Sequence, residues 1–180
     1  MNRTILIIFL YLPLHLIAQD KIQFFNENID FSLNEKEFSV NGLYTFINSN
    51  EQSINQVILF PFAKETDCIF IHNVYNLTYD TKINFQKTRE GIIFKLFIFP
   101  GDTIVLNVAF SQLTCNENVY ILESTQTWSD PLYEANYSLT YDSSVKIDSL
   151  SLKPDTLINN VYYWNKTNYY PKKNFIIWIE

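Results

Sequence analysis

The sequence predicts an all-β fold in which antiparallel sheets pack as a β-sandwich. Apolar and polar residues alternate with a period of two in many short segments, as expected of half-buried strands. These segments recur roughly every 8 to 12 residues, with turn-forming residues between them. Aromatic residues make up 17% of the chain and it contains only 3 glycines, which favours strands rich in large side chains. After the first eighteen residues, no segment shows the 3.6-residue period of an amphipathic helix.

Residues 1–18 are typical of an export signal. Arg3 provides a positive start, residues 5–17 form an apolar run, and Ala18 is the small residue before the expected cut. The run is shorter than the ~20 apolar residues that span a bilayer. We therefore expect a signal-peptide helix, followed by one β-sandwich domain over residues 19–180. That domain should be secreted or periplasmic, with no membrane insertion after cleavage.

Residues 91–110 show the clearest strand pattern in the chain. Apolar residues alternate through both arms of this segment, and Pro100-Gly101 lies between them. Proline presets φ for the second position of a type II turn, and glycine accepts the positive φ of the third. The segment predicts a buried β-hairpin at the centre of the sandwich.

Further strands are expected on both sides of this hairpin. The ranges are 19–26 (an edge strand or strap), 38–48, 54–62, 67–78 and 82–86 before it, and 118–124, 133–142, 145–152, 161–164 and 175–179 after it. Gly42 suggests a bulge, and the switch of apolar residues from odd to even positions near Asp148 predicts a bulge or a change of sheet. Pro61 indicates a strand end or a sheet edge.

Two stretches resemble a known kind of domain. The run FIFPGDTIVLNVAF over residues 97–110 resembles the Pro-Gly-acidic hairpin of immunoglobulin-like domains in exported bacterial proteins, and YILESTQTW over residues 120–128 is similar to a Tyr/Trp stretch in uncharacterised domains of that kind. Together they cover less than a third of the chain after the leader. The resemblance implies an immunoglobulin-like sandwich and no activity, and neither motif carries a catalytic residue.

The charge balance excludes two classes of partner. Without the leader and its Arg3, the chain has 12 basic and 19 acidic residues, a net charge of 12 − 19 = −7. Nucleic-acid binding needs clustered Lys and Arg, and the only local basic pair is Lys172-Lys173. Attachment to anionic membranes is disfavoured for the same reason.

Cys68 and Cys115 are the only cysteines, and both follow the leader. In an oxidising compartment such a pair is normally joined by a disulfide. A disulfide here would close a loop of about 47 residues and stabilise the fold by roughly 4 kcal/mol. The alternative is two separate thiols packed as small hydrophobes. Nothing in the sequence brings the two cysteines within bridging distance, so both readings stay open with a slight preference for separate thiols.

Catalytic and metal-binding side chains are scarce. His72 is the only histidine after the leader, and on a strand it would lie about 13 Å from Cys68, too far for a dyad or a shared metal. No Gly-x-Ser-x-Gly motif and no calcium loop of spaced acids is present. We therefore expect no cofactor and no enzyme activity. The acids in or near loops that could still form a glycosidase pair are Glu65, Asp67, Asp102, Glu123, Asp130, Glu134 and Asp142.

Aromatic residues are the candidates for a binding patch. Five of them are expected around the last loop and a sixth in another loop: Tyr162, Tyr163, Trp164, Tyr169, Tyr170 and Trp128. Flat rings on the rim of a sandwich stack on sugars or anchor a protein partner. The competing interpretation, which the composition favours, is that alternate members are core and the rest are ordinary strand tyrosines.

The sequence thus predicts an exported, non-enzymatic β-sandwich that serves as an interaction or structural module for an unknown protein or glycan. The first alternative is a carbohydrate-binding module using the same rings, and the second is a small carboxylate-dependent glycoside hydrolase. Exposed, coplanar rings would favour the first alternative. Two acids facing each other across a cleft would favour the second.

Overall fold

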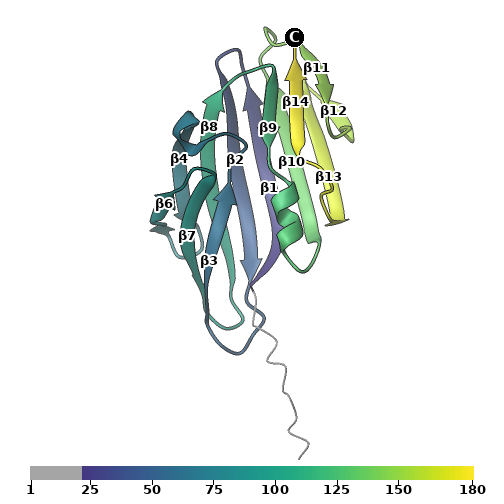
Figure 1. The fold of residues 1–180 in the computed structure, drawn as a ribbon. Coiled ribbons are helices and arrows are strands. Elements are labelled where there is room, and N and C mark those ends of the chain that lie inside the picture. The colour runs from purple at the N-terminus through teal and green to yellow at the C-terminus, as the bar shows by residue number, and fades with distance from the viewer. Residues whose placement is uncertain (1–21) are drawn as a thin grey trace, which may run out of the picture.

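A computed structural model describes residues 22–180 of the protein (Figure 1). The expected signal-peptide helix over residues 1–18 lies outside the described residues. The part of the chain that the structure describes consists of β-strands and two short 3₁₀ turns, η1 (Thr66–Cys68) and η2 (Glu123–Thr127). The predicted all-β class is confirmed.

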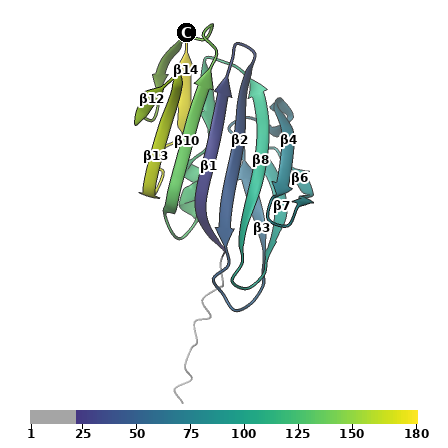
Figure 2. The same cartoon turned by 180° about the vertical axis from the view of Figure 1, so that it is seen from behind.

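One layer of the molecule is a large sheet of eight strands, seen from its outer face in Figure 2. In spatial order these strands are β12 (Thr156–Ile158), β13 (Val161–Tyr169), β10 (Leu132–Tyr141), β1 (Gln23–Leu33), β2 (Glu37–Ile47), β8 (Thr103–Leu113), β4 (Ile69–Asn76) and β5 (Thr81–Lys82). All neighbours are antiparallel except β1 and β10, which run parallel. This parallel pair departs from the expected all-antiparallel arrangement.

Two smaller sheets form the second layer. One contains β11 (Ile147–Leu150), β14 (Phe175–Ile179) and β9 (Glu117–Tyr120), and the other contains β3 (Ile54–Pro61), β7 (Gly91–Ile98) and β6 (Phe85–Lys87). Figure 1 shows both sheets lying over the large one, with a gap between them. The antiparallel sheets therefore pack as a sandwich, as predicted.

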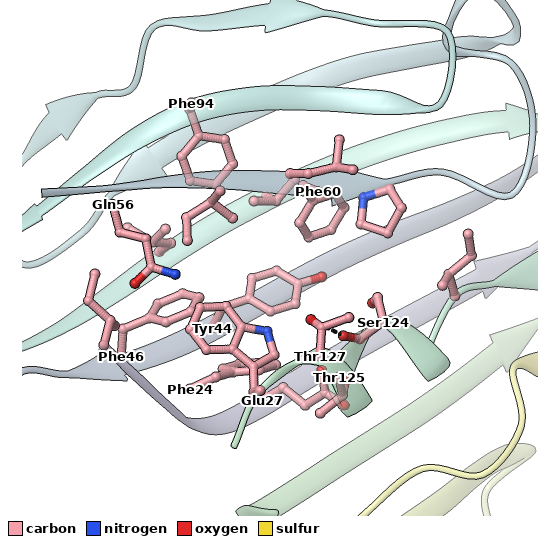
Figure 3. Close-up of a pocket in the computed structure, with 18 of the residues that line it drawn as sticks. Phe24, Glu27, Tyr44, Phe46, Gln56, Phe60, Phe94, Ser124, Thr125 and Thr127 are labelled. Atoms are coloured by element: carbon pink, nitrogen blue, oxygen red, sulfur yellow. Dashed lines mark hydrogen bonds between the residues drawn. The ribbon is translucent and has the colours of Figure 1, made fainter. Parts of the chain in front are cut away.

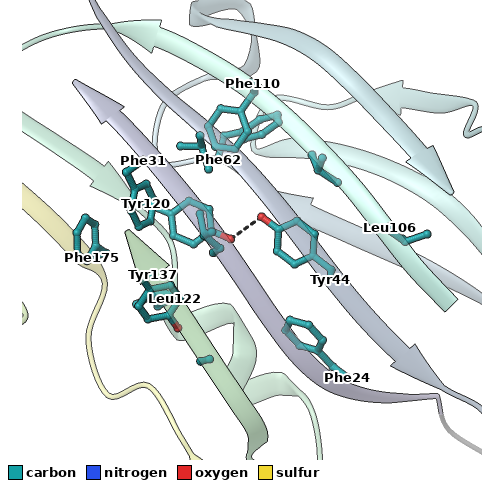
Figure 4. Packing of buried hydrophobic residues seen from close by; sticks show 14 of the residues in the cluster. Phe24, Phe31, Tyr44, Phe62, Leu106, Phe110, Tyr120, Leu122, Tyr137 and Phe175 are labelled. Atoms are coloured by element: carbon teal, nitrogen blue, oxygen red, sulfur yellow. Dashed lines mark hydrogen bonds between the residues drawn. The ribbon is translucent and has the colours of Figure 1, made fainter. Parts of the chain in front are cut away.

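The core between the layers follows from side-chain alternation. Along β1, Ile29, Phe31 and Leu33 are buried, and the residues between them are exposed. The ring of Phe31 stacks on Phe175 of the facing sheet at 4.4 Å and meets Tyr120 edge-on at 5.4 Å (Figure 4). Such aromatic pairs contribute beyond the apolar area they bury, and they join the large sheet to the β11-β14-β9 sheet.

The predicted hairpin over residues 91–110 is wrong in its pairing, although its turn is correct. Gly101 has φ +72°, and the Asp102 amide donates to the Phe99 carbonyl at 3.2 Å, as a type II turn requires. However, β7 pairs with β3 and β6, whereas β8 pairs with β2 and β4. The two arms therefore lie in opposite layers. Alternation could not distinguish these arrangements because both bury every second residue of each arm.

Other details also differ from the expectations. Within the segment expected as an edge strand or strap over 19–26, residues 23–26 begin β1, which lies inside the large sheet. Gly42 pairs in regular register, and the irregularity in that strand pair lies between Phe24 and Asn26. The register shift between Ile147 and Ser149 confirms the predicted bulge. β3 lies at a sheet edge and ends at Pro61, as that proline suggested.

Candidate functional site

A groove opens where the two small sheets fail to meet. Residues 56–61 of β3 form one wall, residues 120–129 around η2 form the other, and inward-facing residues of β1, β2 and β8 form the floor. The cavity has a volume of about 640 Å³, which is within the usual range of ligand pockets. We call this cavity the β3–η2 groove (Figure 3).

Aromatic rings line most of one end of the groove. Phe24 stacks on Phe46 at 5.0 Å, and the half-buried indole of Trp128 lies 5.6 Å from Phe24 and 5.4 Å from Phe46. Phe60 and Phe94 close the opposite wall. This lining favours an apolar ligand, and it places Trp128, one of the six predicted patch residues, at the site.

A buried carboxyl group lies in the floor of the groove. Glu27 is 2% exposed, and its Oε1 accepts a hydrogen bond from the Tyr137 hydroxyl. Tyr137 is the one hydrogen-bond partner that residues 22–180 provide for this carboxyl, which leaves Oε2 available to a ligand. Burial raises the pKa of Glu27 from 4.5 to about 7, and the Tyr137 hydrogen bond offsets part of that shift. Perturbed carboxyl groups in apolar clefts are typical of binding or catalytic sites.

Two tyrosine hydroxyls complete the polar part of the floor. Tyr44 and Tyr120 form a hydrogen bond at 2.9 Å between their hydroxyl groups, linking β2 to β9 (Figure 4). Burial raises the pKa of both groups well above the ordinary value for tyrosine, so both stay neutral. The Tyr44 ring passes over Gly42, where an added Cβ would lie 2.1 Å from the hydroxyl oxygen. Glycine at this position therefore allows the tyrosine pair to form.

Glu27 was not among the acids predicted from the sequence as a possible catalytic pair. After the irregularity between Phe24 and Asn26, β1 continues with Glu27, Ile29, Phe31 and Leu33 on its inner face. An acid in phase with three apolar residues was the available signal for a buried carboxyl. It was missed because the expected strand ended at residue 26.

The predicted aromatic patch is not one surface. Residues 162–164 and Tyr169 belong to β13, which extends beyond the expected strand 161–164 and ends at Tyr169. Trp164 is 0% exposed and donates from Nε1 to the Leu152 carbonyl at 3.2 Å. Tyr162, Tyr163 and Tyr169 are half-buried, and Tyr170 is 40% exposed. A buried indole cannot stack on a sugar, so the structure does not assemble these rings into a glycan platform.

Both cysteines are free thiols in the structure, in agreement with the preference for separate thiols, but neither is packed in the core as a small hydrophobe. Cys68 is exposed. Cys115 is half-buried, donates to the Glu117 carbonyl at 2.8 Å and accepts from Lys64 Nζ at 3.0 Å. These contacts fix the Cys115 thiol locally, and neither cysteine lines the groove.

His72 lies on the large sheet in a hydrogen-bonded chain with a serine and an acid. Its Nε2 is 2.8 Å from Ser111 Oγ, and that hydroxyl donates to Glu37 Oε2 at 3.1 Å. Hydrogen bonds from Ser39 and Ser111 lower the pKa of Glu37. In a serine hydrolase the acid orients the histidine, whereas here it contacts the serine. The arrangement therefore lacks the order of a catalytic relay.

The predicted loop acids do not gather at the groove, where Glu123 is the only one that lines the wall. Glu65 instead forms an ion pair with Arg89, and Asp102 accepts from the Tyr79 hydroxyl. Within residues 22–180, no group of three or more His, Cys, Asp or Glu side chains could hold a metal ion. Nor does that part of the chain contain a helix long and apolar enough to cross a membrane.

A second hollow, of about 750 Å³, lies beside the β3-β7-β6 sheet. It is more open than the groove, and its lining includes Tyr79, Phe85, Phe97 and Phe99. Phe97 and Phe99 are 44% and 50% exposed. The described part of its lining contains one buried polar residue, Asn76, whose Oδ1 already accepts a hydrogen bond from the Tyr79 amide, and no buried acid, so we take the β3–η2 groove as the candidate site.

No known protein family matches the sequence, and no curated protein sequence matches it either. Solved structures do resemble its fold. One is a Legionella pneumophila protein provisionally described as nutrient-binding, with a TM-score of 0.66 and 12% identity over 91% of this chain and 68% of that one.

Two other similar structures are larger proteins. An M1 zinc metallopeptidase from Deinococcus radiodurans has a TM-score of 0.54 and 12% identity, covering 89% of this chain and 42% of the peptidase. Leukotriene A4 hydrolase from Saccharomyces cerevisiae has a TM-score of 0.51 and 12% identity, covering 88% and 29%. The chain thus spans less than half of these enzymes, and at such identities the likeness concerns the β-rich fold alone.

Proposed function

We propose that this protein is an exported, non-enzymatic binding module whose ligand is an elongated apolar molecule held in the β3–η2 groove. The observation that carries the proposal is the groove itself, an aromatic cavity of about 640 Å³ with the buried Glu27 carboxyl in its floor. Specific binding pockets usually combine an apolar lining with a small number of polar groups that orient the ligand. Glu27 would orient the ligand by accepting a hydrogen bond from it.

The residues around the groove support binding without catalysis. Its lining contains Ser, Thr and Tyr hydroxyls and two carboxyls but no histidine, lysine or cysteine from the described residues. The only base available there would be a carboxylate, and within residues 22–180 neither Glu27 nor Glu123 accepts a hydrogen bond from a Ser or Thr hydroxyl of the lining. The provisional description of the Legionella protein as nutrient-binding is compatible with this proposal. The immunoglobulin-like resemblance and the export signal remain predictions from the sequence.

The proposal is tested with N-phenyl-1-naphthylamine, a neutral dye that fluoresces in apolar surroundings. The purified exported protein should enhance and blue-shift the dye emission in a saturable titration. Thr127→Trp places an indole at an exposed position of the groove wall and should weaken dye binding about ten-fold or more, about 1.4 kcal/mol.

Thr140→Trp is the matched control because Thr140 is exposed on β10, outside the groove lining. Direct excitation of the dye keeps the added tryptophan out of the signal. Equal dye affinity in the two variants would mean that the groove is not the site. A titration of the unaltered protein without saturable binding would contradict the proposed function.

A further inference from the structure

Strand β3 is the longest edge strand in the sheets of residues 22–180, although β4 also has a stretch, residues 69–73, that its neighbour β5 does not cover. The other edge strands, β5, β6, β9, β11 and β12, contain two to four residues, and all but β12 carry a charge. β3 contains eight residues, INQVILFP, and no charge. Proteins normally shorten or charge such edges because an apolar edge pairs with other chains. An unprotected edge of this length is therefore a candidate for strand pairing.

The ladder with β7 shows which backbone groups of β3 are free. The Phe62 amide donates to the Glu90 carbonyl directly opposite at 2.9 Å, and the register continues unbroken to Ile54 opposite Ile98. Directly opposed antiparallel pairs alternate between bonded and non-bonded. The backbone N–H and C=O groups of the even-numbered residues of β3 therefore point toward β7. Those of Asn55, Val57 and Leu59 point away from it. Pro61 fits this pattern, since its missing N–H falls at a position that the β7 ladder does not use.

This free edge also forms a wall of the groove. Residues 56–61 all line the cavity, a length of roughly 20 Å for six residues of strand. A peptide paired with this edge would direct alternate side chains onto the aromatic floor. The charged residues of the lining are Glu27 and Glu123, so a cationic side chain complements the groove.

We propose that the occupant of the groove is an extended peptide segment of another protein, with apolar residues and a lysine at alternate positions, which adds a strand to the free edge of β3 and directs the lysine toward Glu27. Backbone hydrogen bonds to β3 would provide affinity, and the floor would select the alternate side chains. This inference rests on the proposed function, because it names the class of ligand for the same groove.

The test uses the capped hexapeptide acetyl-Thr-Val-Thr-Lys-Thr-Val-amide and two relatives in which norleucine or glutamate replaces lysine. The lysine peptide should displace N-phenyl-1-naphthylamine from the purified exported protein. It should bind about ten-fold tighter than the glutamate peptide, a difference of 1.4 kcal/mol. Glu27→Gln should remove most of this preference while the variant still binds the norleucine peptide.

Strand pairing is tested by N-methylating the lysine peptide at either its odd or its even positions. Only one of these two sets of amides can face β3, so one methylated peptide should lose at least about ten-fold in affinity and the other should keep most of it. In the complex, the amide hydrogens of Val57 and Leu59 should also exchange more slowly with solvent.

The outcomes separate this inference from the proposed function. Dye binding without any peptide binding would overturn strand addition and leave the apolar groove as a small-molecule site. Equal losses from both methylated peptides, or dimerisation through β3 that excludes the peptide, would also overturn it. Failure of both dye and peptide would refute the two proposals together.

Discussion

The two small sheets cover the same large sheet in different ways. Under the β11-β14-β9 sheet the packing is closed, with Trp164, Phe175 and Ile177 all 0% exposed. The β3-β7-β6 sheet leaves the groove at its border and presents Val57 and Leu59, which are 60% and 49% exposed. One half of the second layer is therefore fully packed against the large sheet, whereas the other leaves a groove at its border, where we propose that a ligand binds.

The largest expected effect compares isoleucines in the two halves. Ile177 lies in the closed half, and Ile58 lies on β3 beside the groove at 7% exposure. Removing a buried isoleucine to alanine costs about 2–5 kcal/mol, and the cost grows with the cavity that is created. Ile177→Ala should fall near the upper end and Ile58→Ala near the lower, because the groove already leaves Ile58 partly unpacked. Urea unfolding measures both free energies.

Equal losses in that experiment, with unchanged denaturant slopes, would contradict the difference between the halves. Both substitutions remove the same atoms, so a difference between the two losses of unfolding free energy reports the local environment of each isoleucine. A greater loss at Ile58 would mean that the groove half is the better packed one.

The next prediction concerns the buried acid in the groove floor. The pKa of Glu27 is about 7 in the folded protein and 4.5 as its ordinary value, so the folded state binds more protons between these values. The Glu27 contribution to stability should be greatest below about pH 4.5, fall as the pH rises, and be about 3 kcal/mol smaller above about pH 7. Unfolding free energies at several pH values, with and without Glu27→Gln, measure this term.

The Glu27→Gln variant should lose this part of the pH dependence because it cannot ionise. Glu123→Gln is the control, since Glu123 also lines the groove but is exposed. A pH profile of Glu27→Gln that matches the unaltered protein would show that Glu27 ionises normally, and the groove would then lack its distinctive group.

Alternation predicted the strands and the sandwich, but it could not predict which strands pair. Residues 92–98 and 104–110 bury every second side chain whether the two arms pair with each other or face each other across the core. Pairing depends on long-range register, and the local sequence of the Pro100-Gly101 turn is compatible with both arrangements. Alternation also predicted the strand at the centre of the closed half, because Phe175 and Ile177 occupy every second position of a simple strand.

The groove could not be predicted from the sequence because it forms where the two small sheets do not contact each other. Its walls come from β3 and from η2, which are distant in sequence, and no local pattern shows that two sheets leave a gap. Trp164 illustrates a related limit. An aromatic-rich segment such as residues 162–170 can be a loop or a strand, and only the register with β10 shows that Trp164 faces the core opposite Tyr137.

A smaller effect is expected at Gly42, beneath the Tyr44 ring. Gly42→Ala places a methyl group 2.1 Å from the Tyr44 hydroxyl position, so the ring must move, and we expect its hydrogen bond to Tyr120 to break. The loss should be about 1–3 kcal/mol, the usual cost of disrupting a buried hydrogen bond. Thermal or urea unfolding measures it.

Tyr120→Phe provides the comparison because it removes the same hydrogen bond without moving the backbone. If Gly42→Ala acts through the tyrosine pair, the double variant should lose less than the sum of the single losses. Strict additivity would instead show that Gly42 matters for some other reason, and that the link between the groove floor and the closed half contributes little.

The smallest expected effect concerns two surface ion pairs, one beside the β3-β7-β6 sheet and one at the β12-β13 edge of the large sheet. Arg89 and Glu65, beside the β3-β7-β6 sheet, have side chains that are 81% and 60% exposed, whereas Lys166 and Asp155, near β12 and β13, are 27% and 40% exposed. Exposed pairs contribute roughly 0–1 kcal/mol, and less in high salt. Lys166→Gln should therefore cost a few tenths of a kcal/mol in low salt, and Arg89→Gln should not change stability measurably. The Arg89–Glu65 pair joins the segment after β3 to the turn before β7. A larger loss of stability in Arg89→Gln would therefore mean that this pair holds β3 against β7, in contrast to the weak contribution expected here.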